Sequence, residues 1–207
     1  KGSNKGGQEW RMKHHAEEVF FEWMAKWSIT MLYPSDLGYK DEDFKLPKLN
    51  INPIYIKTAF VSKDTLFFDG LHRIADRANL RKDTSKDKID VIKKLVFKND
   101  GQWIIWCGLD VESTLAKNNL KDSREVKGTD DYDYKSTSFE EFQDGKYKTL
   151  ITKIKIGGFG LNFQNANNMI FFGLNDSWEA YYQAVRRSWR FGQKKEVNIH
   201  IVLSEQE

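Results

Sequence analysis

The sequence contains one cysteine, three prolines and no long apolar run. A single cysteine, Cys107, excludes an intramolecular disulfide framework, so we expect a reducing compartment, most simply the cytoplasm. A membrane-spanning helix needs roughly 20 apolar residues, and no apolar signal segment follows the glycine-rich start. We therefore expect a soluble protein with no membrane partner. The four histidines show no Cys/His spacing typical of zinc, so no metal site is expected.

A strong charge of either sign is also lacking. The chain has 33 basic and 30 acidic residues and a formal net charge of +3, so any surface that binds nucleic acid must be local. The length of 207 residues and the hydrophobic content of 40% suffice for one large domain, or for one domain with an appendage.

Two nucleotide-binding motifs are missing as well. No Gly-x-x-x-x-Gly-Lys-Ser/Thr segment occurs, and no Asp-Glu pair follows an apolar strand, because Asp41-Glu42-Asp43 lies in a charged connector. These motifs hold the phosphates and Mg²⁺ in many ATP hydrolases. The isolated chain is therefore expected to be inactive as an ATPase. A free-standing nucleotide-binding α/β enzyme is disfavoured because no glycine-rich turn follows the first expected strand.

Apolar segments of strand length alternate with helical patterns along most of the chain. The run Trp103-Ile-Ile-Trp-Cys107 is typical of a parallel strand buried on both faces. Other expected strands cover 51–61, 125–127, 147–152, 169–172 and 197–203. Helices are expected at 66–80, 89–97, 110–118 and 136–144, with the charged run 81–88 as a solvated loop. This order predicts an α/β fold with a mostly parallel sheet between two helical layers.

The first fifty residues have a different character. Apolar residues at helical spacing predict an amphipathic helix over 12–27 with an aromatic face, suited to core or interlobe packing. Turn residues begin at Tyr33-Pro34, and a charged, irregular stretch follows. We therefore divide the chain into 1–35, a linker at 36–50, and a main domain at 51–207.

One long helix is predicted over 176–193. Asp176 can serve as its N-cap with Glu179 closing a capping box, and Gly192 lies where a helix ends. The face expected to pack on the sheet carries Tyr181, Ala184, Val185 and Ser188.

Another side of this helix carries Gln183, Arg187 and Arg190 at positions i, i+4 and i+7. An amide and two guanidiniums on one element suit an anion with several oxygens, such as a nucleotide phosphate. The alternative is that these arginines only complement the helix dipole and are solvated.

A glycine-rich loop follows the strand that ends at Thr152. Gly157, Gly158 and Gly160, with Asn162 after them, can bring backbone N–H groups close to a phosphate or to a partner lobe. The carboxyl ends of parallel strands are the usual ligand sites of such folds. A tight turn explains the glycines equally well.

The string Gln-Ala-x-x-Arg-x-x-Arg-x-Gly-Gln at 183–193 resembles motif VI of superfamily 2 helicases, in particular the Swi/Snf-like DNA translocases and their phage-type DEAD/DEAH relatives. The glycine loop resembles motif V, and 103–110 resembles motif IV. By this resemblance, 51–207 is a helicase C-terminal RecA-like domain, a three-layer α/β sandwich. The segment before it resembles the end of a first lobe and the crossing into the second.

The resemblance implies roles for individual residues. Arg187 and Arg190 would be catalytic arginine fingers, and Thr152 and Lys153 would contact DNA. The ATP-binding residues would be Gln183, Gly158, Gly160 and Asn162. ATP and Mg²⁺ would be the cofactors of the complete protein, with its N-terminal helicase lobe and duplex DNA as partners, in a bacterial or phage-infected cell. The alternative is a non-catalytic DNA- or protein-binding module with a RecA-like fold.

Overall fold

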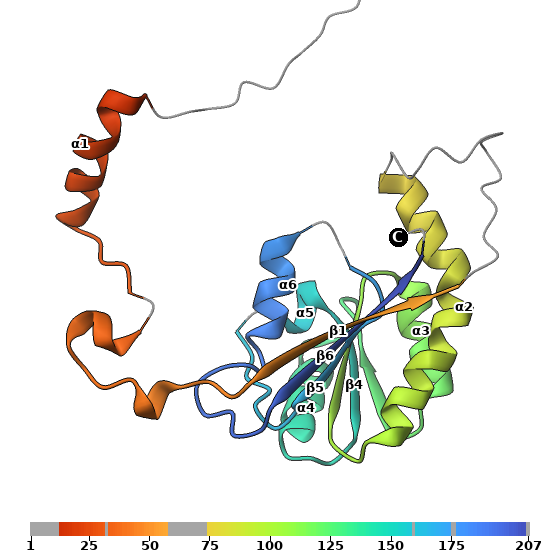
Figure 1. Cartoon of the computed structure of the whole chain (residues 1–207). Coiled ribbons are helices and arrows are strands. Elements are labelled where there is room, and N and C mark those ends of the chain that lie inside the picture. Colours follow the sequence, from red (N-terminus) through yellow and green to blue (C-terminus); the bar gives the residue numbers. More distant parts are fainter. Residues whose placement is uncertain (1–12, 32, 58–73, 159, 175–176, 206–207) are drawn as a thin grey trace, which may run out of the picture. The chain divides into compact units, whose positions relative to one another are not determined.

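A computed structural model describes residues 13–31, 33–57, 74–158, 160–174 and 177–205 (Figure 1). The chain forms two compact units, Lys1–Lys45 and Leu46–Glu207. The first unit contains helix α1 (His14–Ala25) and the 3-10 helices η1 (Pro34–Leu37) and η2 (Glu42–Phe44). The helix predicted over 12–27 is shorter than expected, but its aromatic face is present, with the ring centroids of Phe20 and Trp23 6.0 Å apart. No helix in the described part of the chain has the length and apolar character that a bilayer crossing requires.

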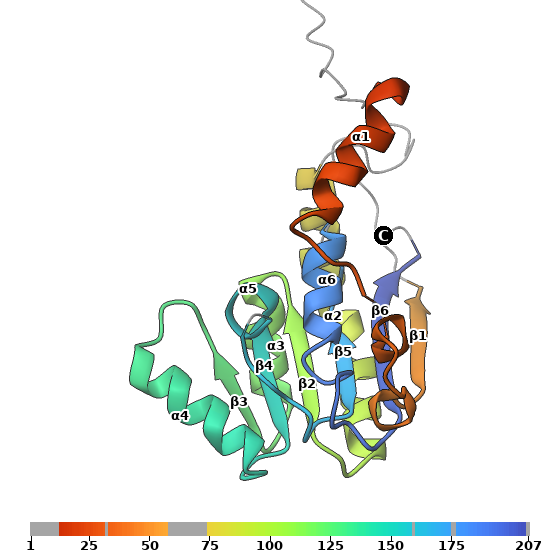
Figure 2. The same ribbon diagram turned by 90° about the vertical axis from the view of Figure 1, so that its left-hand side faces the viewer.

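The second unit is built around a six-stranded sheet in which all pairings are parallel (Figure 2). Its order is β1-β6-β5-β2-β4-β3. The strands are β1 (Leu49–Ile56), β2 (Trp103–Cys107), β3 (Ser123–Val126), β4 (Thr149–Lys153), β5 (Asn168–Phe171) and β6 (Val197–Ser204). The helices are α2 (Ile74–Lys98), α3 (Asp110–Asn119), α4 (Tyr132–Gln143), α5 (Ile154–Gly157) and α6 (Trp178–Val185).

The helices cover both faces of the sheet. Figures 1 and 2 show α2 and α3 on one face and α4 and α6 on the other. Strand β2 serves both cores, because Ile105 packs in the cluster with α2 and α3 while Ile104 packs in the cluster with α4 and α6. All five residues of β2 are buried, as expected for a central parallel strand. The predicted three-layer α/β fold is confirmed.

The predicted loop at 81–88 is wrong, because α2 runs through it without a break. Arg81, Thr84, Ser85 and Lys88 are buried, and their spacing of three and four places them on one side of the helix. The hydroxyl of Thr84 donates to the carbonyl of Leu80 at 2.8 Å. The run is an amphipathic helix whose inner face carries charge. The part of the predicted helix before residue 74 lies outside the described residues.

Candidate functional site

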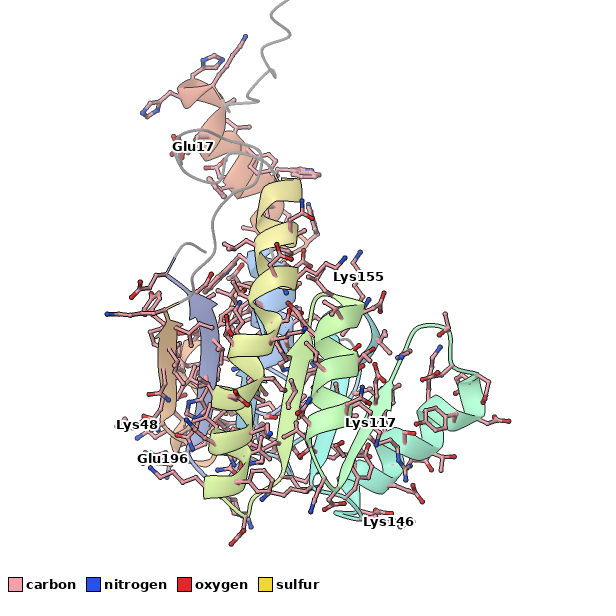
Figure 3. The ribbon with its side chains drawn as sticks, turned by 90° about the vertical axis from the view of Figure 1, so that its right-hand side faces the viewer. Glu17, Lys48, Lys117, Lys146, Lys155 and Glu196 are labelled. Atoms are coloured by element: carbon pink, nitrogen blue, oxygen red, sulfur yellow. The ribbon has the colours of Figure 1, made fainter. Side chains whose placement is uncertain are left out.

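The parallel strands all end at one edge of the sheet, and the predicted site residue Lys153 lies there, at the end of β4. Figure 3 shows Lys155 at this end of the domain and Lys146 at the opposite end, before β4. A cleft of about 310 Å³ opens at the ends of β2, β4 and β5. Its lining residues are Arg81, Trp106, Cys107, Gly108, Lys153, Ile154, Lys155 and Gly173. Three of these side chains are cationic, but Arg81 and Lys153 each form an ion pair with a carboxylate, Glu112 and Asp110.

Helix α6 begins and ends differently from the sequence prediction. The N-cap is Ser177, whose hydroxyl oxygen accepts a hydrogen bond from the N–H of Ala180 at 3.1 Å. Asp176, the predicted N-cap, lies outside the described residues. The helix was predicted to reach Gln193 but ends at Val185.

The segment that follows the helix packs on the glycine loop. Beyond Val185 the backbone forms tight turns, with the N–H of Arg187 donating to the carbonyl of Ala184 at 3.2 Å. The carbonyl of Arg187 accepts from the N–H of Phe163 at 2.9 Å. Ala184, Val185 and Ser188 are buried as predicted, and Tyr181 packs against Phe171 with ring centroids 4.9 Å apart.

Arg187 is held by contacts on two sides. Its Nε and Nη2 donate to the backbone carbonyl and the side-chain Oε1 of Gln183, at 3.0 and 3.1 Å, and its Nη1 donates to the carbonyl of Leu161 at 3.0 Å. Partial burial, followed by the charges of Arg190 and Arg186, lowers the pKa of Arg187. A guanidinium still stays charged in proteins. These contacts use three of its five N–H donors, so the others can serve a further acceptor.

Arg190 joins the same arrangement from the next turn. Its Nη1 donates to the side-chain oxygen of Asn162. Gln193 strengthens the link, since its Nε2 donates to the carbonyl of Gln164 at 3.0 Å. The residues resembling motifs V and VI are therefore one hydrogen-bonded unit, although Gln183 and Asn162 come from separate elements.

The sequence predicts that all three glycines lie in a loop, but Gly157 does not. Gly157 is the last residue of α5, a single helical turn that follows β4 directly. Gly158 is its C-cap, and a Cβ atom there would collide with the carbonyl oxygen of Ile154. Gly160 has φ +77°, a backbone conformation that favours glycine. The local backbone geometry is therefore enough to explain why glycine occurs at positions 158 and 160, without a bound ligand.

The two residues expected to contact DNA face different surroundings. Thr152 is buried, and its hydroxyl donates to the carbonyl of Val126 at 3.0 Å. Lys153 lies at the cleft, where its ammonium is 2.7 Å from a carboxylate oxygen of Asp110. This contact lowers the pKa of the Asp110 carboxyl. Of Thr152 and Lys153, only Lys153 therefore places a charged group where an external phosphate could contact it.

Sequence reasoning missed Arg81 and Glu112. The charge pattern predicts a solvated loop at Arg81, whereas Arg81 forms a buried ion pair with Glu112 at 2.8 Å beside the cleft. The spacing of Arg81, Ser85 and Lys88 on one helical face was a usable signal, but the run of charges suggested solvent exposure. In the described part of the chain, no group of three or more His, Cys, Asp or Glu side chains is arranged to hold a metal ion.

Comparison with known proteins agrees with this geometry. Residues 87–192 match the family described as helicase conserved C-terminal domain. The chain is 35% identical over 83 residues to the bifunctional helicase and thymine dioxygenase JBP2 of Leishmania braziliensis, which is 38% of this chain and 7% of that protein. It is 30% identical over 75 residues to the DNA repair and recombination protein RAD26 of Saccharomyces cerevisiae, 36% of this chain and 7% of that protein.

A solved structure shows the same likeness. The crystal structure of the C-terminal part of the Fun30 ATPase domain matches with a TM-score of 0.50 and 26% identity, over 57% of this chain and 41% of that one. The expected bacterial or phage origin stays a prediction. The family match includes the glycine loop and the arginines after α6. The chain belongs to the helicase conserved C-terminal domain family of superfamily 2, with Swi/Snf-like proteins among its relatives.

Proposed function

We propose that this chain is the C-terminal lobe of an ATP-dependent DNA translocase or helicase, and that Arg187 and Arg190 are arginine fingers for ATP held by a P-loop lobe outside this chain. The observation that carries the proposal is the fixation of both guanidiniums on residues 161–162 of the glycine loop. Pre-positioned cations are what phosphoryl transfer requires, because its catalysis depends on positioning and charge stabilisation.

Each residue has a separate task in this proposal. Gln183 holds the Arg187 guanidinium through its amide oxygen, and Asn162 holds that of Arg190. The remaining donors of Arg187 would point to the phosphate oxygens when the two lobes close. Gly158 and Gly160 shape the loop on which both arginines rest. ATP with Mg²⁺ supplies the phosphoryl group that is transferred, and an arginine finger contributes about 10³-fold or more to the rate.

In this proposal, DNA binds at the cleft at the ends of β2, β4 and β5. Lys153 and Lys155 both line the cleft, and exposed ammonium groups bind backbone phosphates without reading sequence. Thr152 would act indirectly, by tying the end of β4 to β3 through Val126. Because β4, α5 and the glycine loop are continuous, lobe closure over ATP would also move these lysines. This continuity would couple ATP hydrolysis to the contact of the two lysines with DNA.

The test is ATP hydrolysis by the protein with both lobes, with and without duplex DNA. We expect DNA-stimulated turnover to fall about 10³-fold in Arg187→Ala and in Arg190→Ala. Arg186→Ala is the matched control, because that guanidinium lies over the rings of Tyr182 and Trp189, at 6.0 and 5.4 Å. Turnover that survives Arg187→Ala would instead favour the non-catalytic binding module.

A further inference from the structure

The guanidinium of Arg81 lies over the ends of two neighbouring strands, β2 and β5. Glycines follow both strands, and both make room for it. A Cβ atom on Gly108 would lie 2.5 Å from Nη2 of Arg81, and one on Gly173 would lie 2.5 Å from its Nε. Neither position could carry a larger side chain without displacing the arginine.

Glu112 completes this arrangement from α3. Its Oε1 accepts from Nε and Nη2 of Arg81 at 3.1 and 2.8 Å, and its Oε2 accepts from Nη2 at 3.0 Å. The same Oε2 accepts from the backbone N–H groups of Gly108 and Leu109, at 2.8 and 3.0 Å. The carboxylate is fully buried, so the turn after β2 and the guanidinium are fixed to one group.

Arg81 also reaches toward α6. Its Nη1 donates to the carbonyl of Leu174 at 3.0 Å, in the segment that leads from β5 to the N-cap Ser177. Farther along α2, the fully buried Lys88 donates to the carbonyl of Phe172 at 3.4 Å. One helix therefore holds the chain at two points between β5 and α6.

We propose that Arg81, paired with Glu112, is a positioning residue for the arginines that follow α6. The pair fixes the start of the β5–α6 connection to the turn after β2, and so sets where α6 begins and where Arg187 stands. This inference rests on the proposed function, since it assigns Arg81 a task only if Arg187 acts on ATP. Arg81 is assigned a positioning task because four of its hydrogen bonds go to Glu112 and Leu174.

Arg81→Lys in the two-lobe protein tests this inference. Lysine keeps the charge but lacks the planar fork that serves Glu112 and Leu174 together. Because misplacement by about 1 Å can cost 10²-fold, we expect kcat to fall at least about tenfold, with KM for ATP changed less than about threefold. Assays run below the unfolding temperature of each variant. Ile92→Ala, a core truncation in the same helix, should leave kcat within about twofold.

A double-mutant cycle separates positioning from stability. In an Arg187→Ala background, Arg81→Lys should have no further effect on kcat, because the group it positions is gone. Glu112→Gln gives the same test if Arg81→Lys does not fold. The inference would be overturned, and the proposed function left standing, by either of two results: Arg81→Lys and Arg187→Ala lower kcat independently, so that their effects multiply, or Arg81→Lys lowers kcat no more than Ile92→Ala does. Unchanged turnover in Arg187→Ala would overturn the proposed function, and the inference with it.

Discussion

Replacing Thr152 by valine exchanges a buried hydroxyl for a methyl group of similar size. The hydroxyl donates to the carbonyl of Val126 at 3.0 Å, and Thr152 is 1% exposed. Losing this hydrogen bond and leaving a buried acceptor unpaired should lower the free energy of unfolding by about 1–2 kcal/mol. For a chain of this size, the melting temperature should fall by roughly 2–8 °C.

The same strand offers a matched control. Thr149 is fully buried, and its hydroxyl has no hydrogen-bond partner among the described residues. Thr149→Val should therefore leave stability unchanged or raise it, because an unpaired polar group is removed from the core. Thermal unfolding of both variants measures the difference. Equal losses would show that the Thr152 hydrogen bond is not what stabilises the end of β4.

DNA binding by the two-lobe protein completes this prediction. Thr152→Val should bind duplex DNA as the wild type does, because the hydroxyl faces Val126. Lys153→Ala should weaken binding for all sequences and lower the slope of log K against log salt by about 1. If Thr152→Val weakens DNA binding as strongly as Lys153→Ala without loss of stability, the threonine contacts the phosphate directly and our reasoning fails.

Three further predictions concern the same domain. Gly160→Ala should lower the free energy of unfolding by about 1–2 kcal/mol, because of the positive φ at this position. Gly158→Ala should lower it further, because the added Cβ atom collides with the carbonyl of Ile154. Chemical denaturation of both variants measures these losses. Burial raises the pKa of the Cys107 thiol, so a thiol-specific disulfide reagent should modify Cys107 no faster than the chain unfolds. Burial lowers the pKa of His200 from its usual 6.5, so the unfolded chain binds the proton first and stability should fall as the pH drops below about 6.5; His200→Phe should remove this part of the pH profile.

The strands were the most predictable part of the fold. The run at 103–107 was assigned with its observed bounds, because a parallel strand buried on both faces must be apolar throughout. The charged run in α2 misled for the opposite reason. Lys88 is fully buried yet donates to the carbonyl of Phe172, and a sequence does not show that such a partner exists.

The site was predictable in its residue types but not in its contacts. Helical spacing placed Gln183 and Arg187 together, and Gln183 does hold the guanidinium. The helix nevertheless ends before Arg187, whose N–H donates to the carbonyl of Ala184 rather than to that of Gln183, while its carbonyl accepts from Phe163 of the glycine loop. Such a stop is decided by tertiary packing rather than by local propensity. The contact of Arg190 with Asn162 likewise joins segments that only the fold brings together.

Binding of a transition-state analogue tests the central claim most directly. An arginine finger contributes to the transition state of phosphoryl transfer more than to ground-state binding. In the two-lobe protein, Arg187→Ala should weaken binding of ADP–aluminium fluoride by about 10²-fold or more, and binding of a non-hydrolysable ATP analogue by less than about threefold. Equal weakening of both ligands, or of neither, would contradict the role assigned to Arg187.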